Sequence, residues 1–161
     1  MFRRLLTPAV LLSLIFSLGH IAQADTPSDP GLVVDHVAGG VEKVKEKLTL
    51  FFNFKKEDKA RYRQYLTEKR LAELKYVVDT NQIDSIEPVA SRYSTYAGLL
   101  TNFVVKEEIK TKRDDLLTMF ERHRQIVEEL QKGFKFESGW WLMLQHNINV
   151  TKLSSDQLKT L

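Results

Sequence analysis

Side chains that could carry catalysis or hold a metal are few and scattered in this sequence. Cysteine is absent, which removes thiol nucleophiles and thiolate metal sites. Three of the four histidines, His36, His123 and His146, lie in separate segments and do not form the His-Glu-x-x-His spacing of a zinc site. The neighbours Asp114 and Asp115 do not face each other on a helix, and the dipole of a helix start explains both acids. We therefore predict no catalytic residue, no metal site and no cofactor, and we expect a protein that is not an enzyme.

The tyrosines of the sequence suggest one alternative function, a ligand-binding cavity between helices. Five tyrosines fall in the second and third of the helices expected below: Tyr62, Tyr65, Tyr76, Tyr93 and Tyr96. Rings at the edge of a core, with their hydroxyls in water, explain such tyrosines. The alternative is a cavity between helices that carries a small ligand or a metal. His123 lies on an apolar stripe and could line such a cavity, although a hydrogen-bonded core position is the more common setting for histidine there.

The adjacent residues Trp140 and Trp141 are the strongest candidates for an interaction surface. Neighbouring side chains on a helix point about 100° apart, so both rings are buried only if the segment lies in a groove. In that case the segment closes the core. If one ring is exposed instead, it forms an apolar edge that meets a membrane surface or a partner protein.

The start of the chain has the order of a secretory signal peptide. Arg3 and Arg4 precede an almost wholly apolar run over residues 9–21, and Ala22-Gln23-Ala24 follows with small residues where a signal peptidase cleaves. We expect cleavage between Ala24 and Asp25, and an exported protein in the periplasm or the medium. An uncleaved anchor is the alternative, but the apolar run is short against the roughly 20 residues of a bilayer span.

Charge and hydropathy narrow the classes of partner. The formal net charge is +3, and the loss of the two leader arginines would lower it to +1. Because both signs are interspersed along the rest of the chain, we expect no nucleic acid as a partner. No second long apolar run follows, so we expect no transmembrane segment after cleavage. The partner then expected is an unknown envelope protein or a membrane surface.

Apolar residues three or four positions apart predict helices through most of the chain. The first helix is expected over residues 34–52, with Gly39-Gly40 as an interruption or as its true start, and apolar stripes follow over residues 60–78, 86–104 and 116–130. Six polar residues from Lys110 to Asp115 separate the last two stripes. Thr111 and Asp114 fit a capping box there, so we expect a break, with one long helix as the alternative.

These patterns predict an all-α fold, an antiparallel bundle of three to four helices followed by a short helical C-terminal tail. The domains expected are a signal peptide at 1–24, a linker at 25–33, the helical bundle at 34–132 and the tail at 133–161. The tail is set apart by its composition, and Ser154-Ser155-Asp156-Gln157 could cap a last short helix.

Arg70 stands beside the apolar stripe of the second helix and has two candidate roles. Glu73 lies three residues on and could pair with it, at about 0.5 kcal/mol if the pair is exposed. If Arg70 lies across a helix seam instead, it could reach an acid on a neighbouring helix and set the register. The candidates on other helices are Glu107, Glu108, Asp114 and Glu121.

The same stretch resembles a bacterial family of exported helical proteins, a domain of unknown function. The resemblance rests on Val44-Lys45-Glu46-Lys47-Leu48, the turn from Phe51 to Phe54, Lys59-Ala60 and Arg70-Leu71-Ala72-Glu73-Leu74. It covers residues 35 to 130, and it departs from the family at Gly39-Gly40 and at Thr67. It implies a bacterial exported α-helical domain, makes Arg-Leu-x-Glu a signature of the fold, and carries over no catalytic residue. The expected function is therefore a non-enzymatic interaction or envelope-associated module.

Overall fold

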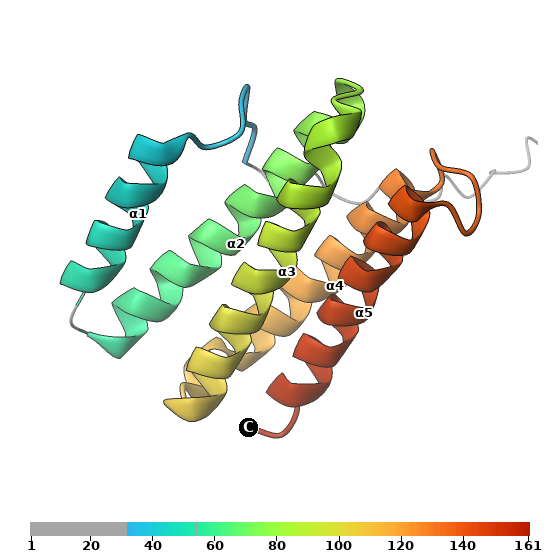
Figure 1. Ribbon diagram of the computed structural model, residues 1–161. Helices are drawn as coiled ribbons and strands as arrows, with labels where there is room; N and C mark the ends of the chain where they lie inside the picture. Colours follow the sequence, from blue (N-terminus) through green and yellow to red (C-terminus); the bar gives the residue numbers. More distant parts are fainter. Residues whose placement is uncertain (1–31, 54) are drawn as a thin grey trace, which may run out of the picture.

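The computed structural model describes residues 32–53 and 55–161, and every regular element in this part of the chain is helical. The helices are α1 (Gly40–Phe52), α2 (Lys56–Asp79), α3 (Ile83–Lys106), the short 3-10 helix η1 (Lys110–Lys112), α4 (Arg113–Gln131) and α5 (Gly139–Leu158). Successive α-helices run in alternating directions (Figure 1). The predicted all-α bundle is confirmed. The predicted signal peptide at 1–24, its cleavage site at Ala24 and Asp25, and most of the predicted linker lie outside the described residues.

The hydrophobic core is built from four of these helices. α2 packs on α3, α3 on α5, and α4 on α5. One cluster of buried side chains, including Leu74, Tyr93 and Leu144, lies where α2 ends and α3 begins. A second cluster, including Leu100, Phe120 and Leu158, fills the other end. Neither cluster contains a buried residue of α1, which lies against α2 at the edge of the bundle (Figure 1).

The C-terminal segment differs from the predicted tail of short helices. It is one helix of 20 residues, α5, and it packs along α3 and α4 as a full member of the bundle. Polar residues at its buried positions hid the stripe from the sequence pattern. The hydroxyl of buried Thr151 donates to the Ile148 carbonyl at 2.7 Å, and Ser94 of α3 donates to the side chain of buried Asn147. The residues Ser154 to Gln157 lie inside α5 and do not cap it, and Ser138 is its N-cap.

Two helix boundaries decide between alternatives that the sequence analysis left open: the start of the first helix and the break after the third. The first helix begins at Gly40, because Gly39 is extended and serves as its N-cap. The alternative that Gly39-Gly40 mark the true start is therefore confirmed, and the start at residue 34 is wrong. The predicted break between the third and fourth stripes is confirmed. α3 ends at Lys106, and Glu108 adopts a left-handed conformation with φ of 51°. The expected capping box is wrong, since the N-cap of α4 is Lys112 and no side chain caps it.

Candidate functional site

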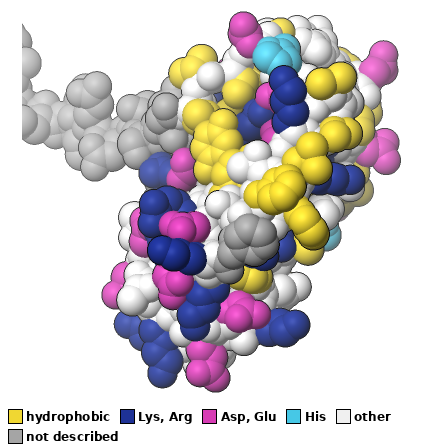
Figure 2. Space-filling view, turned by 90° about the vertical axis from the view of Figure 1, so that its left-hand side faces the viewer, with side chains coloured by type: hydrophobic (Ala, Val, Ile, Leu, Met, Phe, Trp, Pro, Cys, Tyr) yellow, Lys and Arg dark blue, Asp and Glu magenta, His cyan; other side chains and the backbone are white. Residues whose placement is uncertain are grey.

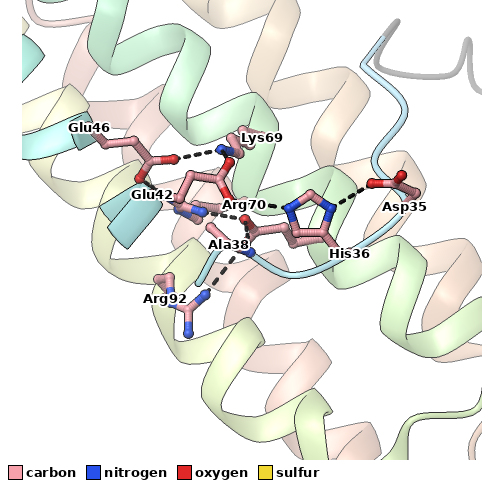
Figure 3. Close-up of polar contacts among 9 residues, drawn as sticks. Asp35, His36, Ala38, Glu42, Glu46, Lys69, Arg70 and Arg92 are labelled. Carbon is pink, nitrogen blue, oxygen red and sulfur yellow. Dashed lines mark hydrogen bonds and ion pairs between the residues drawn. The ribbon is translucent and has the colours of Figure 1, made fainter. Parts of the chain in front are cut away.

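Arg70 is the centre of a buried ion network between α1 and α2. Its side chain has no exposed surface, and its guanidinium lies over the ring of Tyr96 from α3, 4.9 Å from the centroid. One terminal nitrogen donates to Glu73 on the same helix. The other donates to Glu46 of α1 (Figure 3). The acid that Arg70 reaches on a neighbouring helix is therefore Glu46, and not one of the four acids proposed from the sequence.

Glu73 ties three parts of the chain together. Besides Arg70, its carboxylate accepts from the backbone N–H of Ala38 at 3.1 Å and from Arg92 of α3 at 3.3 Å. Ala38 lies in the extended segment just before α1 and is itself buried. A carboxylate with three donors is well satisfied in a buried position, where an unpaired charge is very costly. Glu73 thus holds the entry to α1 against α2 and α3.

Lys69 extends the network toward solvent. Its ammonium donates to Glu46 at 2.7 Å and also to Glu42, one helical turn earlier on α1. Burial alone would lower the pKa of Lys69, but the hydrogen bonds to the two carboxylates outweigh it and raise the pKa. Glu42 in turn has its pKa lowered, chiefly by the bond from Lys69. The two acids on the inner side of α1 are therefore both engaged by cations of α2.

His36 continues this chain of contacts at the surface. Its Nε2 lies 3.3 Å from Glu42, and its Nδ1 lies 2.6 Å from the carboxylate of Asp35. The hydrogen bonds with Asp35 first, and then with Glu42, raise the pKa of His36. Because the ring is exposed, these contacts order the segment before α1 without shielding it from water.

The network fixes which side of α1 faces the bundle. The one buried residue of α1 is Glu46, and Glu42 lies a turn away on the same side. An amphipathic helix in a soluble protein normally turns its apolar stripe to the core. Here the carboxylates of α1 are drawn inward by the buried cations, so the stripe is turned outward.

The outward side of α1 is a continuous apolar surface. It consists of Val41, Val44, Leu48, Phe51 and Phe52, and their exposed fractions run from 51% at Leu48 to 73% at Val41. Figure 2 shows hydrophobic side chains gathered on this face of the molecule, with Lys and Arg side chains near them. We call these five side chains the α1 apolar face. Contiguous exposed apolar surface of this kind marks an interaction site more often than a random scatter of residues does.

Comparison with known protein families identifies the family of the region that contains α1 and the ion network. Residues 35–135 match the family described as Domain of unknown function (DUF5667). The chain belongs to this family. The predicted resemblance to a domain of unknown function is thereby confirmed at that level. No curated protein and no solved structure matched the chain.

The DUF5667 match includes α1 to α4 and stops before α5, so the predicted interaction residues Trp140 and Trp141 lie outside it. Both side chains are half-buried. Trp140 packs against the core cluster, while the ring of Trp141 meets Phe136 edge-on at 4.8 Å between centroids. The structure does not single them out as a protruding anchor, and the apolar surface that protrudes is on α1 of the DUF5667 region.

The three candidate histidines lie on separate parts of the chain: His36 before α1, His123 in α4 and His146 in α5. His123 is fully buried, and its Nδ1 lies 3.1 Å from the hydroxyl of Tyr93. Burial first, and then the charge of Arg122, lower the pKa of His123 to about 3, so the ring is neutral. Among the described residues no group of three histidines or acids is placed to hold a metal, and no helix is both long and apolar enough to cross a bilayer.

The sequence analysis missed Glu42 and Glu46, the residues that orient α1. A pattern that points to them is present. The two acids lie four positions apart, on the side of the helix opposite the apolar stripe. What the sequence does not contain is the burial of Arg70 and Lys69, the two cations that make the acidic side of α1 the inner one.

Proposed function

We propose that this DUF5667 protein is a non-enzymatic, exported module that binds another component of the cell envelope through the α1 apolar face. The single observation that carries the proposal is the inverted orientation of α1. Its five large apolar side chains face water, while its acids face the bundle. Exposing that surface is unfavourable in water, and a partner that covers it removes the cost.

The ion network supports an interaction role, because it holds α1 in one orientation with the α1 apolar face toward solvent. Removing either carboxylate partner would leave buried charge uncompensated, so α1 is held in one orientation. A preformed surface loses less conformational entropy on binding than a mobile one does. The arrangement around Arg70 is thus a support for the face, and all of its acids are already engaged by cations.

Site-specific photo-cross-linking in cells tests the proposal. A photoreactive amino acid replaces Leu48 on α1 in the full chain, and the control places it at Leu153 of α5, which is also exposed. We expect a discrete adduct, to protein or to lipid, from position 48 only, and we expect Val44→Asp to abolish it. Equal adducts from both positions, or none from position 48, would overturn the proposal. Fractionation of the same cells tests the proposed export.

The second candidate function is a small-ligand carrier. A groove between α1, α2 and α3 supports it. The groove has a volume of about 340 Å³, and Leu50, Leu66 and Leu99 are among its lining residues. Arg63 also lines it, and its Nε is buried without a hydrogen-bond partner. An acyl chain with an anionic head suits this combination. His123 does not line the groove, contrary to the cavity expected from the sequence.

A melting experiment separates the two candidates. A ligand that binds only the folded state raises the melting temperature. If the groove is a binding site, dodecanoate should raise the melting temperature of the protein and should fail to do so in Arg63→Gln. No shift with dodecanoate in the unchanged protein would reject an acyl carrier and leave the interaction module.

A further inference from the structure

The outward side of α1 carries charge of one sign only. The acids of this helix are Glu42 and Glu46, and both are engaged by Lys69 on the inner side. The remaining charged residues of α1 are Lys43, Lys45 and Lys47, of which Lys45 and Lys47 are exposed. The inversion of α1 therefore does two things at once. It exposes the apolar stripe, and it turns the two acids of α1 to the opposite side of the helix.

The positions of the lysines match those of a helix that lies in a lipid interface. At 100° per residue, Lys45 and Lys47 fall on opposite borders of the α1 apolar face, with Val44, Leu48 and Phe51 between them. Lysines at the border of an apolar stripe can extend their alkyl chains along it and place their ammonium groups at the level of phosphates. Amphipathic helices with lysine on the polar side and phenylalanine and leucine on the other bind anionic lipid surfaces in this way.

The choice of cation argues for lipid and against a protein partner. Protein interfaces are depleted in lysine and enriched in arginine, whose planar group pairs with carboxylates in a fixed geometry. All basic residues of α1 are lysines, and Lys55 adds another exposed ammonium just beyond its C-terminal end. Lysine suits a diffuse negative surface, because such a surface demands charge without defined geometry.

From these observations we propose that the α1 apolar face docks onto the surface of an anionic phospholipid bilayer, with α1 parallel to the membrane plane. This inference rests on the proposed function and names its partner. Valines, leucine and phenylalanines of the face enter the boundary between headgroups and acyl chains, and Lys45 and Lys47 lie against the phosphates. The ion network beneath keeps the acids of α1 away from that surface.

The absence of cysteine allows a direct test. Leu48→Cys on α1 and Leu153→Cys on α5 each supply one attachment point for an environment-sensitive fluorophore. Each variant is expressed as the full chain and purified from the cells in the form in which it accumulates there. It is then mixed with vesicles of phosphatidylglycerol and phosphatidylcholine. We expect the label at position 48 to move into an apolar environment and the label at position 153 to stay in water. Because the readout is local, a leader that binds lipid does not imitate it.

Two changes test the charge argument separately from the apolar face. Vesicles of phosphatidylcholine alone should leave the label at position 48 in water. Replacing Lys45 and Lys47 together by glutamine should weaken binding to the anionic vesicles by roughly tenfold to thirtyfold, since each lysine near such a surface adds about a factor of five. The matched control replaces Lys152 of α5 and Lys159, the residue just after its end, by glutamine and should leave binding unchanged.

The outcomes distinguish this inference from the function on which it rests. A label at position 48 that stays in water with anionic vesicles overturns the membrane inference, and so does equal insertion into both kinds of vesicle. If photo-cross-linking at position 48 then yields a protein adduct, the interaction module stands and its partner is a protein. If it yields no adduct at all, both proposals fall.

Discussion

Arg70 of α2 and Glu46 of α1 form an ion pair in which the arginine side chain is fully buried and the glutamate nearly so. Arg70 also binds Glu73, and Glu46 also binds Lys69, so neither charge depends on a single partner. The pair joins a helix of the bundle to a helix that contributes no buried residue to the core clusters. An attachment made this way depends on charge, and its strength can be measured by removing one group at a time.

Replacement of Glu46 by glutamine should lower the free energy of unfolding by about 3 kcal/mol, because it leaves the buried network with one positive charge more than its carboxylates can balance. Urea denaturation measures the change. Glu129→Gln is the matched control, since it removes an exposed pair with Lys132 and should cost about 0.5 kcal/mol or less. Equal effects of the two substitutions would show that the buried network does not hold the fold.

His123 should make the protein less stable in acid. Its folded pKa of about 3 lies below the ordinary value of 6.5, so between these two the unfolded chain binds a proton that the folded chain does not. Its contribution is complete above pH 6.5 and is lost as the pH falls toward 3, with a loss of about 1.5 kcal/mol between pH 6.5 and 5. Urea denaturation at several pH values measures the slope. His123→Gln should flatten this part of the profile, and an unchanged profile would contradict the buried neutral ring.

His36 should titrate above its ordinary pKa of 6.5, because Asp35 and Glu42 both stabilise its charged form. The favourable contacts are present in full below pH 6.5 and are lost as the pH rises through the folded pKa. NMR titration of the ring protons measures the pKa directly. Asp35→Asn should lower the pKa more than Glu42→Gln does, since Asp35 is the larger cause. The reverse order would show that the ring faces α1 more closely than the structure has it.

Trp140→Ala should destabilise the protein more than Trp141→Ala. Trp140 packs on the core cluster, and a half-buried tryptophan of this kind should cost about 2–3 kcal/mol, less than the 3–5 of a fully buried one. Trp141 loses its edge contact with Phe136, worth about 1 kcal/mol. Thermal denaturation of both variants measures the difference. A Trp141→Ala variant that unfolds while Trp140→Ala does not would reverse the assignment.

The parts of the fold that the sequence predicted are those set by local patterns. The stripes of α2, α3 and α4 follow the helical period, and the break after Lys106 follows a run of polar residues. The apolar pattern did not reveal α5 as a bundle helix, because polar residues occupy several of its buried positions, namely Asn147, Thr151 and Ser154. The side-chain oxygen of Asn147 accepts from Ser94 of α3, and Thr151 donates to the helix backbone, and no periodicity of apolar residues can reveal such bonds.

The candidate site was less predictable, because the orientation of α1 depends on a contact between residues far apart in the chain. Arg70 and Glu73 could be recognised as a pair from their spacing alone. That Arg70 is buried, and that its second partner is Glu46, follows only from the packing of α1 on α2. The apolar period of α1 correctly predicted a helix, but the usual rule that such a stripe faces inward fails here.

The ionic attachment of α1 separates its opening from that of the rest of the molecule. When α1 leaves α2, carboxylates, ammonium groups and the Arg70 guanidinium become hydrated, and the two core clusters of the bundle stay covered. An opening of that kind has a small heat-capacity change and a weak dependence on denaturant. The amide protons of α1 should therefore exchange with solvent through a local route that urea barely accelerates, whereas those around Leu100 exchange only when the whole bundle unfolds. We therefore expect two cooperative units, of which the smaller is joined to the larger by charge.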